Sequence, residues 1–182
     1  LLTQRVHMDA FIKGQGYSPV KCLKDAKELS MPPSLHKYIM NTRKRVDSLV
    51  DLIKTEGHVQ KMTINFPKDQ NGNYYCRDEV FEYLTSNPAL TVVSGGYGNL
   101  EFTKAGVDKG VGLKKLSGIL NIPLDQTMAI GDTENDLAII KSAHIGVAMG
   151  NATEQLKADS DYITDTNDND GVAKAIYHFL SL

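Results

Sequence analysis

The stretch "IGDTENDLAII" (Ile130–Ile140) decides the fold, because it joins one apolar run to another through a short polar turn. Three acidic residues and one amide lie within five positions: Asp132, Glu134, Asn135 and Asp136. The glycine that precedes the first carboxylate allows the backbone to turn sharply there. The pattern predicts a strand that ends at this turn and a helix that begins directly after it.

The alternation of short apolar runs and helical patterns continues along the rest of the chain. Predicted strands cover residues 126–131, 145–150 and 162–165, and predicted helices cover residues 109–121, 134–143, 152–160 and 171–180. In the first helix, the residues expected to be buried are Val111, Leu113, Leu116, Ile119 and Leu120. Strict alternation of this kind predicts parallel βαβ units, with helices on both faces of the sheet.

The first part of the chain has a different character. One long amphipathic helix is predicted between Ser34, as its N-cap, and Gly57, as its end. Apolar and polar residues alternate over residues 59–66, which predicts a strand. Residues 90–105 are predicted to form two strands around a glycine-rich turn. We therefore expect an α/β protein in two parts, residues 1–102 with antiparallel strands and residues 103–182 with parallel strands.

Composition excludes several classes of protein. The chain of 182 residues is 41% hydrophobic and 23% charged, which is ordinary for a globular protein, and its net charge of -2 provides no basic field for nucleic acid or an anionic membrane. No apolar run approaches the length of a membrane span. Cys22 and Cys76 are far apart and favour free thiols in a reducing cytosol over a disulfide, so we expect a cytoplasmic protein.

The acidic turn has two readings. Ligands of parallel α/β sheets bind at the carboxyl ends of the strands, where Asp132 is expected, and Asp136 follows four residues later. Two carboxylates and an amide suit Mg²⁺, which completes its shell with water and substrate phosphate. Helix capping is the alternative, with Asp132 or Thr133 as the cap and with Glu134 and Asp136 at the positive end of the helix dipole. Lys109 opens the preceding helix against its dipole, which indicates either a nearby anion or a solvated surface lysine.

These motifs carry a family resemblance. The runs "KGVGLKKLSGILNI" and "MAIGDTENDLAIIKSAHIGVAMGNATEQLKADSDYITDTNDNDGVAKAI" resemble the carboxyl half of a haloacid dehalogenase-like phosphatase, in the Cof-type sugar-phosphate phosphatase branch. The resemblance extends from Leu100 to Leu180, and residues 34–102 are similar to the family's cap in layout alone. It implies a partial Rossmann-like core, residues 103–182, joined to a C2-type α/β cap, residues 1–102.

The resemblance also implies a mechanism and its residues. An aspartate nucleophile takes the phosphoryl group of a small phosphate monoester, such as a sugar phosphate, and water then hydrolyses the aspartyl-phosphate. Asp132 and Asp136 match the family's Mg²⁺ carboxylates. Asn135 matches its phosphate-binding amide, and Lys109 matches the catalytic lysine that pairs with nucleophile and phosphate.

Substrate choice is expected to lie in the cap. The pocket residues predicted near the junction of cap and core are Tyr97, Asn99 and Glu101.

The sequence departs from the family in one large respect, since it contains no strand that ends in D-x-D-G-T. We therefore expect the nucleophile and the central strand of the sheet to be missing. The chain alone is then expected to lack phosphatase activity and to bind Mg²⁺ weakly. The open edge at residues 127–130 would be covered by another copy, by the missing segment or by a rearranged terminus.

Two other readings of the chain stay open. One is a non-catalytic α/β module that binds phosphorylated ligands or proteins. The other is a fragment of an ion-pumping ATPase, although Thr133 stands where those pumps usually have glycine.

Overall fold

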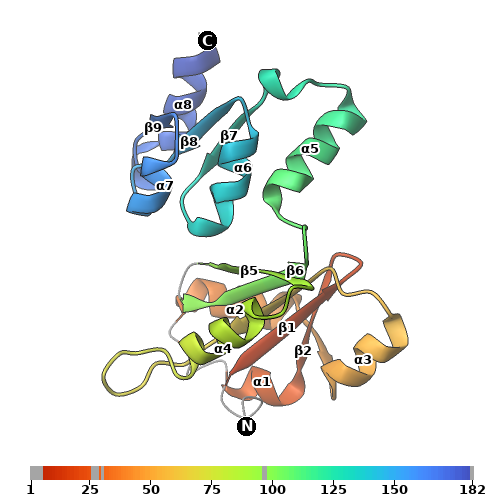
Figure 1. Ribbon diagram of the computed structural model, residues 1–182. Helices are drawn as coiled ribbons and strands as arrows, with labels where there is room; N and C mark the ends of the chain where they lie inside the picture. Colours follow the sequence, from red (N-terminus) through yellow and green to blue (C-terminus); the bar gives the residue numbers. More distant parts are fainter. Residues whose placement is uncertain (1–5, 26–28, 30, 96–97, 181–182) are drawn as a thin grey trace. The chain divides into compact units, whose positions relative to one another are not determined.

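The computed structural model describes residues 6–25, 29, 31–95 and 98–180, and the chain separates into two compact units between Ala105 and Gly106 (Figure 1). The unit before this boundary contains mainly antiparallel strands, and the unit after it contains parallel strands. The predicted α/β class is confirmed.

The first unit is built on a six-stranded sheet in the order β3-β2-β1-β4-β6-β5. Its strands are β1 His7–Ile12, β2 Gln15–Pro19, β3 Lys44–Val46, β4 Lys61–Asn65, β5 Leu90–Ser94 and β6 Leu100–Lys104. Its helices are α1 Val20–Asp25, α2 Pro33–Thr42, α3 Leu49–Glu56 and α4 Arg77–Thr85. All neighbouring strands are antiparallel except β2 and β3, which are parallel.

The apolar core of this unit lies on one face of the sheet. Ile64 of β4 pairs with Leu100 of β6, and both pack with Phe66 and with Val80 of α4. The alternation of strand residues places them on that face together, because successive side chains point to opposite faces. The strand predicted over residues 59–66 is therefore confirmed.

The single long helix predicted after Ser34 is wrong. The chain instead forms α2, the short strand β3 and α3, because Arg43 adopts an extended conformation with φ −85° and ψ 132°. Ser48 begins α3 by accepting a hydrogen bond from the Asp51 backbone N–H at 3.2 Å. Gly57 ends it with φ 76°, as the pattern predicts.

A buried polar cluster explains this break. The Asp9 carboxylate of β1 is 1% exposed and accepts hydrogen bonds from Arg43 Nε at 2.9 Å and from the hydroxyl of Ser18. The His7 ring Nε2 lies 2.9 Å from the same carboxylate. The Arg43 guanidinium also covers the ring of Phe11 at 4.8 Å, so these contacts outside α2 favour an end to the helix at this point.

The second unit contains a three-stranded parallel sheet in the order β7-β8-β9. Its strands are β7 Met128–Gly131, β8 Ile145–Ala148 and β9 Tyr162–Ile163, and its helices are α5 Lys109–Leu120, α6 Leu137–Ser142, α7 Glu154–Ala158 and α8 Gly171–Leu180. Three 3₁₀ turns cover Leu124–Gln126, Glu134–Asp136 and Asn167–Asn169. The predicted alternation of strands and helices is confirmed here.

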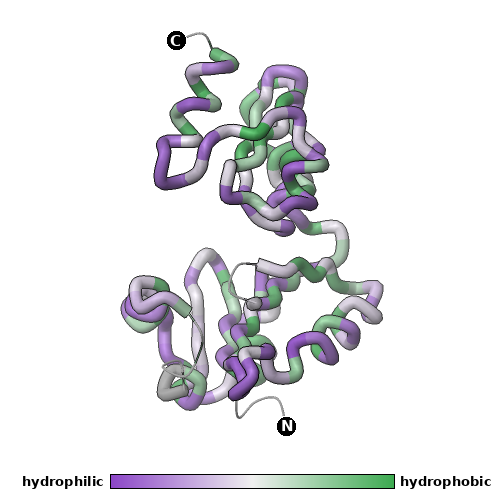
Figure 2. Tube along the Cα trace, turned by 90° about the vertical axis from the view of Figure 1, so that its left-hand side faces the viewer, coloured by the Kyte–Doolittle hydropathy of each residue, from purple (hydrophilic) through white to green (hydrophobic). Residues whose placement is uncertain are grey.

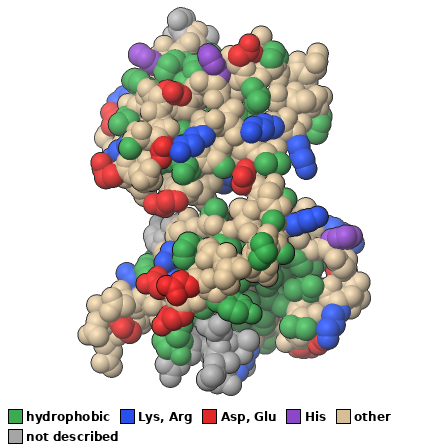
Figure 3. Space-filling model, in the orientation of Figure 1, with side chains coloured by type: hydrophobic (Ala, Val, Ile, Leu, Met, Phe, Trp, Pro, Cys, Tyr) green, Lys and Arg blue, Asp and Glu red, His purple; other side chains and the backbone are tan. Residues whose placement is uncertain are grey.

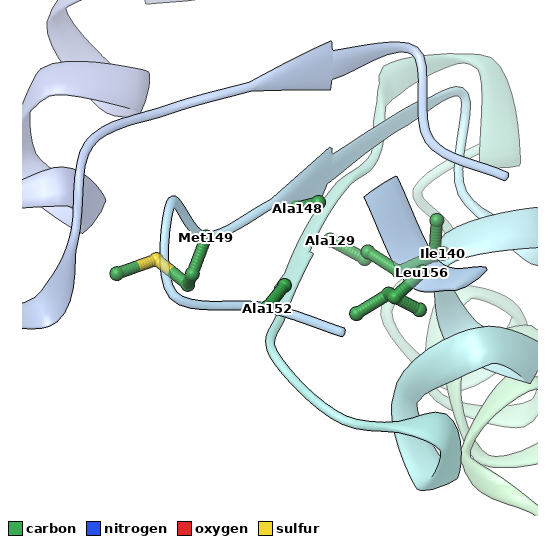
Figure 4. Packing of buried hydrophobic residues seen from close by; sticks show 6 residues of the cluster. All are labelled: Ala129, Ile140, Ala148, Met149, Ala152 and Leu156. Carbon is green, nitrogen blue, oxygen red and sulfur yellow. The ribbon is translucent and has the colours of Figure 1, made fainter. Parts of the chain in front are cut away.

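Small residues on the strands let the helices approach this sheet closely. The buried core consists of Ala129, Ile140, Ala148, Met149, Ala152 and Leu156. Figure 4 shows Ile140 of α6 and Leu156 of α7 lying side by side near the two strand alanines, while Met149 points away from them. Hydrophilic and hydrophobic residues alternate along α8 in Figure 2, as expected for a helix with one packed face.

The burial predicted for α5 is wrong at Leu116, Ile119 and Leu120, while Val111 and Leu113 are half-buried. Within the described residues, Gly110 is the buried position of this helix, while Leu116 is 52% exposed, Ile119 80% and Leu120 56%. Among those same residues, β7 pairs with β8 on one side and has no partner strand on the other. This unit therefore has exposed apolar residues on α5 and, among the described residues, an edge of β7 without a partner strand.

On the face drawn in Figure 3, Lys and Arg side chains stand among Asp and Glu rather than in one basic region. In the part of the chain that the structure describes, no helix is long and apolar enough to cross a membrane.

The Asp9 cluster leads to a stability prediction. Burial alone would raise the pKa of Asp9, but hydrogen bonds from His7, Ser18 and Arg43, with the charge of His7, hold it below its usual value. Asp9→Ala leaves Arg43 without its buried partner, so we expect it to lower the free energy of unfolding at pH 7 by about 3 kcal/mol. Urea denaturation measures this.

Asp78→Ala is the control, because Asp78 is 88% exposed in its ion pair, and it should cost less than about 1 kcal/mol. A carboxylate with a lowered folded pKa stabilises above its unfolded pKa of about 3.9. The difference between wild type and Asp9→Ala should therefore shrink as pH falls from 4 through the folded pKa. A difference at pH 7 no larger than that of the control would contradict the role of the cluster.

Candidate active site

The candidate site is built on the turn that follows β7. Gly131 ends the strand, and a Cβ placed there would lie 2.4 Å from Cβ of Asp136, so only glycine permits this close return of the chain. The Gly131 carbonyl accepts from the N–H of Met149 at 2.9 Å, and the Asp132 carbonyl accepts from the N–H of Thr153 at 3.1 Å. The turn is therefore held against the segment that follows β8.

Asp136 is the structural centre of the turn. It is 9% exposed, and its Oδ2 accepts from the backbone N–H of Asp132 at 3.0 Å and of Thr133 at 3.4 Å. Its Oδ1 accepts from the ammonium group of Lys109. Both carboxylate oxygens are thus engaged by groups of this chain, and Asp136 meets the backbone of Asp132.

Lys109 reaches this carboxylate from the first turn of α5. Asp108 begins the helix by accepting from the N–H of Val111 at 2.8 Å. Lys109 Nζ also lies 3.3 Å from Oδ1 of Asn135. The structure thus brings Lys109, Asn135 and Asp136 together, and the anion that it places beside the lysine is a carboxylate of the same chain.

Close packing of α5 on α6 sets the position of the lysine. Gly110 lies against α6, where an added Cβ would come 2.4 Å from the carbonyl oxygen of Ala138 and 2.5 Å from the hydroxyl of Ser142. That hydroxyl itself donates to the Ala138 carbonyl at 2.7 Å. A side chain at position 110 would therefore move Lys109 away from its partners.

Asp132 fits the requirements of a Mg²⁺ ligand better than Asp136 does. Its carboxylate is exposed at the carboxyl end of β7, and within the described residues no group donates a hydrogen bond to it. The described residues contain no group of three His, Cys, Asp or Glu side chains that could hold a metal. Mg²⁺ is commonly bound through one or two carboxylates, and water and substrate phosphate complete its coordination shell. The free carboxylate of Asp132 could therefore be one such ligand.

Thr133 is a residue whose contribution the sequence pattern did not reveal. Its hydroxyl donates to Oδ1 of Asn135 at 2.7 Å. The sequence offered Thr133 as a possible cap, and Thr133 is the N-cap of the 3₁₀ turn Glu134–Asp136. Its contact with Asn135 was not predictable, because it depends on how this turn folds.

The predicted pocket residues lie in the first unit and stay predictions. Glu101 of β6 forms an ion pair with Lys61 of β4 at 3.1 Å. Asn99 precedes β6, and Tyr97 lies outside the described residues.

Comparison with known proteins adds independent findings. The sequence profile of the haloacid dehalogenase-like hydrolases matches residues 20–176. The phosphatase YwpJ of Bacillus subtilis is 34% identical over 177 residues, which are 96% of this chain and 58% of that protein. The 5-amino-6-(5-phospho-D-ribitylamino)uracil phosphatase YcsE of the same organism is 45% identical over 104 residues, which are 57% of this chain and 42% of that protein.

A solved structure agrees with these sequence relatives. The sugar phosphatase BT4131 superposes with a TM-score of 0.72 at 27% identity, covering 97% of this chain and 62% of that one. The chain therefore spans 42% and 58% of the two curated relatives and 62% of this structural one.

The contact of α5 with α6 gives a prediction with a matched control. Gly110→Ala forces the helices apart, and we expect it to lower the free energy of unfolding by about 2 kcal/mol, the usual cost of overpacking. Gly112→Ala lies in the same helix with nothing within 4 Å of the added Cβ, so it should be neutral or stabilising by about 0.5 kcal/mol. Thermal and urea unfolding of both variants measure the difference, and equal effects would show that the close approach is unimportant.

Proposed function

We propose that this chain supplies part of the active site of a phosphatase for small phosphate monoesters. The chain belongs to the haloacid dehalogenase-like hydrolase family, and the proposal proceeds from that membership. The observation that carries the proposal is the cluster of Lys109, Asn135 and Asp136 beside the exposed Asp132. It combines donors for phosphate oxygens with a free carboxylate for Mg²⁺.

The proposed substrate is a small phosphorylated metabolite, such as a sugar phosphate. One relative is a phosphatase of a phosphoribitylamino-uracil, and a structural relative is a sugar phosphatase. Both descriptions belong to those proteins. They support the same substrate class here because the similarity to the first covers 57% of this chain and the similarity to the second covers 97% of it.

The roles of the residues follow from their contacts. Lys109 would donate its remaining N–H group to an oxygen of the phosphoryl group, and Asn135 would donate from its amide nitrogen. Asp136 holds the lysine and the turn in place. Asp132 would hold Mg²⁺, which neutralises charge on the transferring group when it is bound.

The covalent step belongs to an aspartate nucleophile, which we propose lies outside this chain. The ester P–O bond breaks as the carboxylate attacks phosphorus, and the substrate oxygen leaves with a proton from a general acid that would also lie outside this chain. Water then attacks the phosphorus and gives a proton back to that group, and the P–O bond to the aspartate breaks, which releases phosphate and the free carboxylate. Lys109 and Asn135 would stabilise the phosphoryl oxygens in both halves of the reaction. The absence of D-x-D-G-T from the sequence favours a second candidate for the chain by itself, a module that binds phosphorylated ligands without turnover.

Two substitutions test the proposal in a longer form of this protein, one that has the full length of its relatives. Asp132→Ala should collapse Mg²⁺-dependent turnover of a generic phosphate ester while the melting temperature stays close to that of wild type, because its carboxylate is exposed. Asp136→Ala should lower both, since it leaves Lys109 and two backbone N–H groups without their acceptor.

The 182-residue chain alone is the negative control in this assay and should give no measurable turnover. Activity of Asp132→Ala within twofold of wild type would refute the metal role. Robust Mg²⁺-dependent turnover by the chain alone would refute the external nucleophile.

We also propose that the uncovered edge of β7 and the exposed face of α5 are covered in the working protein, by another copy or by a further segment. Unpaired backbone groups and exposed leucine and isoleucine side chains both favour association. Light scattering of the chain alone should therefore give a mass above that of the monomer. Ile119→Lys should shift the mass toward the monomer, because it places a charge on the face of α5. A wild-type chain that is monomeric at high concentration would contradict this proposal.

A further inference from the structure

We propose that Thr133 is a positioning residue whose hydroxyl fixes the orientation of the Asn135 side-chain amide, so that the amide nitrogen is presented to a phosphoryl oxygen. The inference rests on the proposed phosphatase function for its ligand, but the contact between the two side chains stands on geometry alone. The distance from Thr133 Oγ1 to Asn135 Oδ1 is 2.7 Å.

Lys109 decides which atom of the amide faces the threonine. An asparagine can place either its oxygen or its nitrogen toward a hydroxyl, since a hydroxyl both donates and accepts. An ammonium group only donates, and Lys109 Nζ lies 3.3 Å from the same amide atom. That atom is therefore the oxygen, and the Thr133 hydroxyl must act as its donor.

The opposite end of the amide is then available to a ligand. With its oxygen engaged by Thr133 and Lys109, Asn135 keeps two N–H donors, and no described residue accepts a hydrogen bond from them. Phosphoryl oxygens only accept, so a reversed amide would turn oxygen lone pairs toward them. Fixing the amide in one orientation before the ligand arrives removes the free-energy cost of ordering it during binding.

The backbone of Thr133 is anchored firmly enough for this task. Its N–H donates to Asp136 Oδ2 at 3.4 Å, and its carbonyl accepts from the N–H of Asp136 at 2.9 Å. The threonine, asparagine and aspartate side chains are thus set by one 3₁₀ turn. Thr133 would act on the reaction through Asn135 and would not touch the substrate.

The test compares Thr133→Val, which removes the hydroxyl at nearly constant shape, with Thr133→Ser, which keeps it. In the ¹⁵N-labelled 182-residue chain, the side-chain NH₂ signals of Asn135 should keep their positions in Thr133→Ser and move or broaden in Thr133→Val. Unchanged signals in Thr133→Val, or equal changes in both variants, would overturn the proposal.

Kinetic measurements on the longer form of this protein, with the full length of its relatives, provide the second readout. Thr133→Val should lower kcat/KM about fivefold, which corresponds to the loss of one ordinary hydrogen bond. Thr133→Ser keeps the hydroxyl, so its kcat/KM should stay close to that of wild type. In an Asn135→Ala background, Thr133→Val should have no further effect, because its action passes through the amide. An equal loss in both backgrounds would show a general structural role instead. If that protein hydrolyses no phosphate ester, the proposed function fails, while the NMR comparison still decides the role of Thr133.

Discussion

The second unit depends on one shared carboxylate. Asp136 accepts from the Lys109 ammonium group of α5 with one oxygen and from two backbone N–H groups of the turn after β7 with the other. Because it is nearly buried, each of these donors would be costly to leave without an acceptor. The interaction therefore fixes the helix and the strand end together, and the close approach at Gly110 makes that geometry possible.

Local patterns in the sequence were sufficient for much of this arrangement. The alternation of apolar runs with helical spacing predicted β7, β8 and β9 and the helices between them, because each element is defined by residues close together in the chain. The same holds for the position of Asp132 at the end of a strand. The motifs at Lys109 and at the acidic turn gave a resemblance that the family match supports.

Features that depend on distant contacts could not be predicted in this way. The helical spacing after Ser34 is genuine, but Arg43 binds Asp9, which is 34 positions away, and the helix ends there. The spacing along α5 likewise indicated a buried face without indicating what covers it, and Ile119 is 80% exposed. The hydrogen bond from Thr133 to Asn135 follows from the exact fold of a 3₁₀ turn, which composition does not specify.

The pairing of Lys109 with Asp136 also determines the net charge of the site. The two charges cancel, so the exposed Asp132 and Glu134 leave the turn with an excess of negative charge. A phosphate dianion that approaches alone is therefore repelled, whereas one accompanied by a divalent cation is not. We expect anion and cation to raise each other's affinity, since such coupling is reciprocal. We therefore expect this surface to favour the neutralised pair of ions over either ion separately.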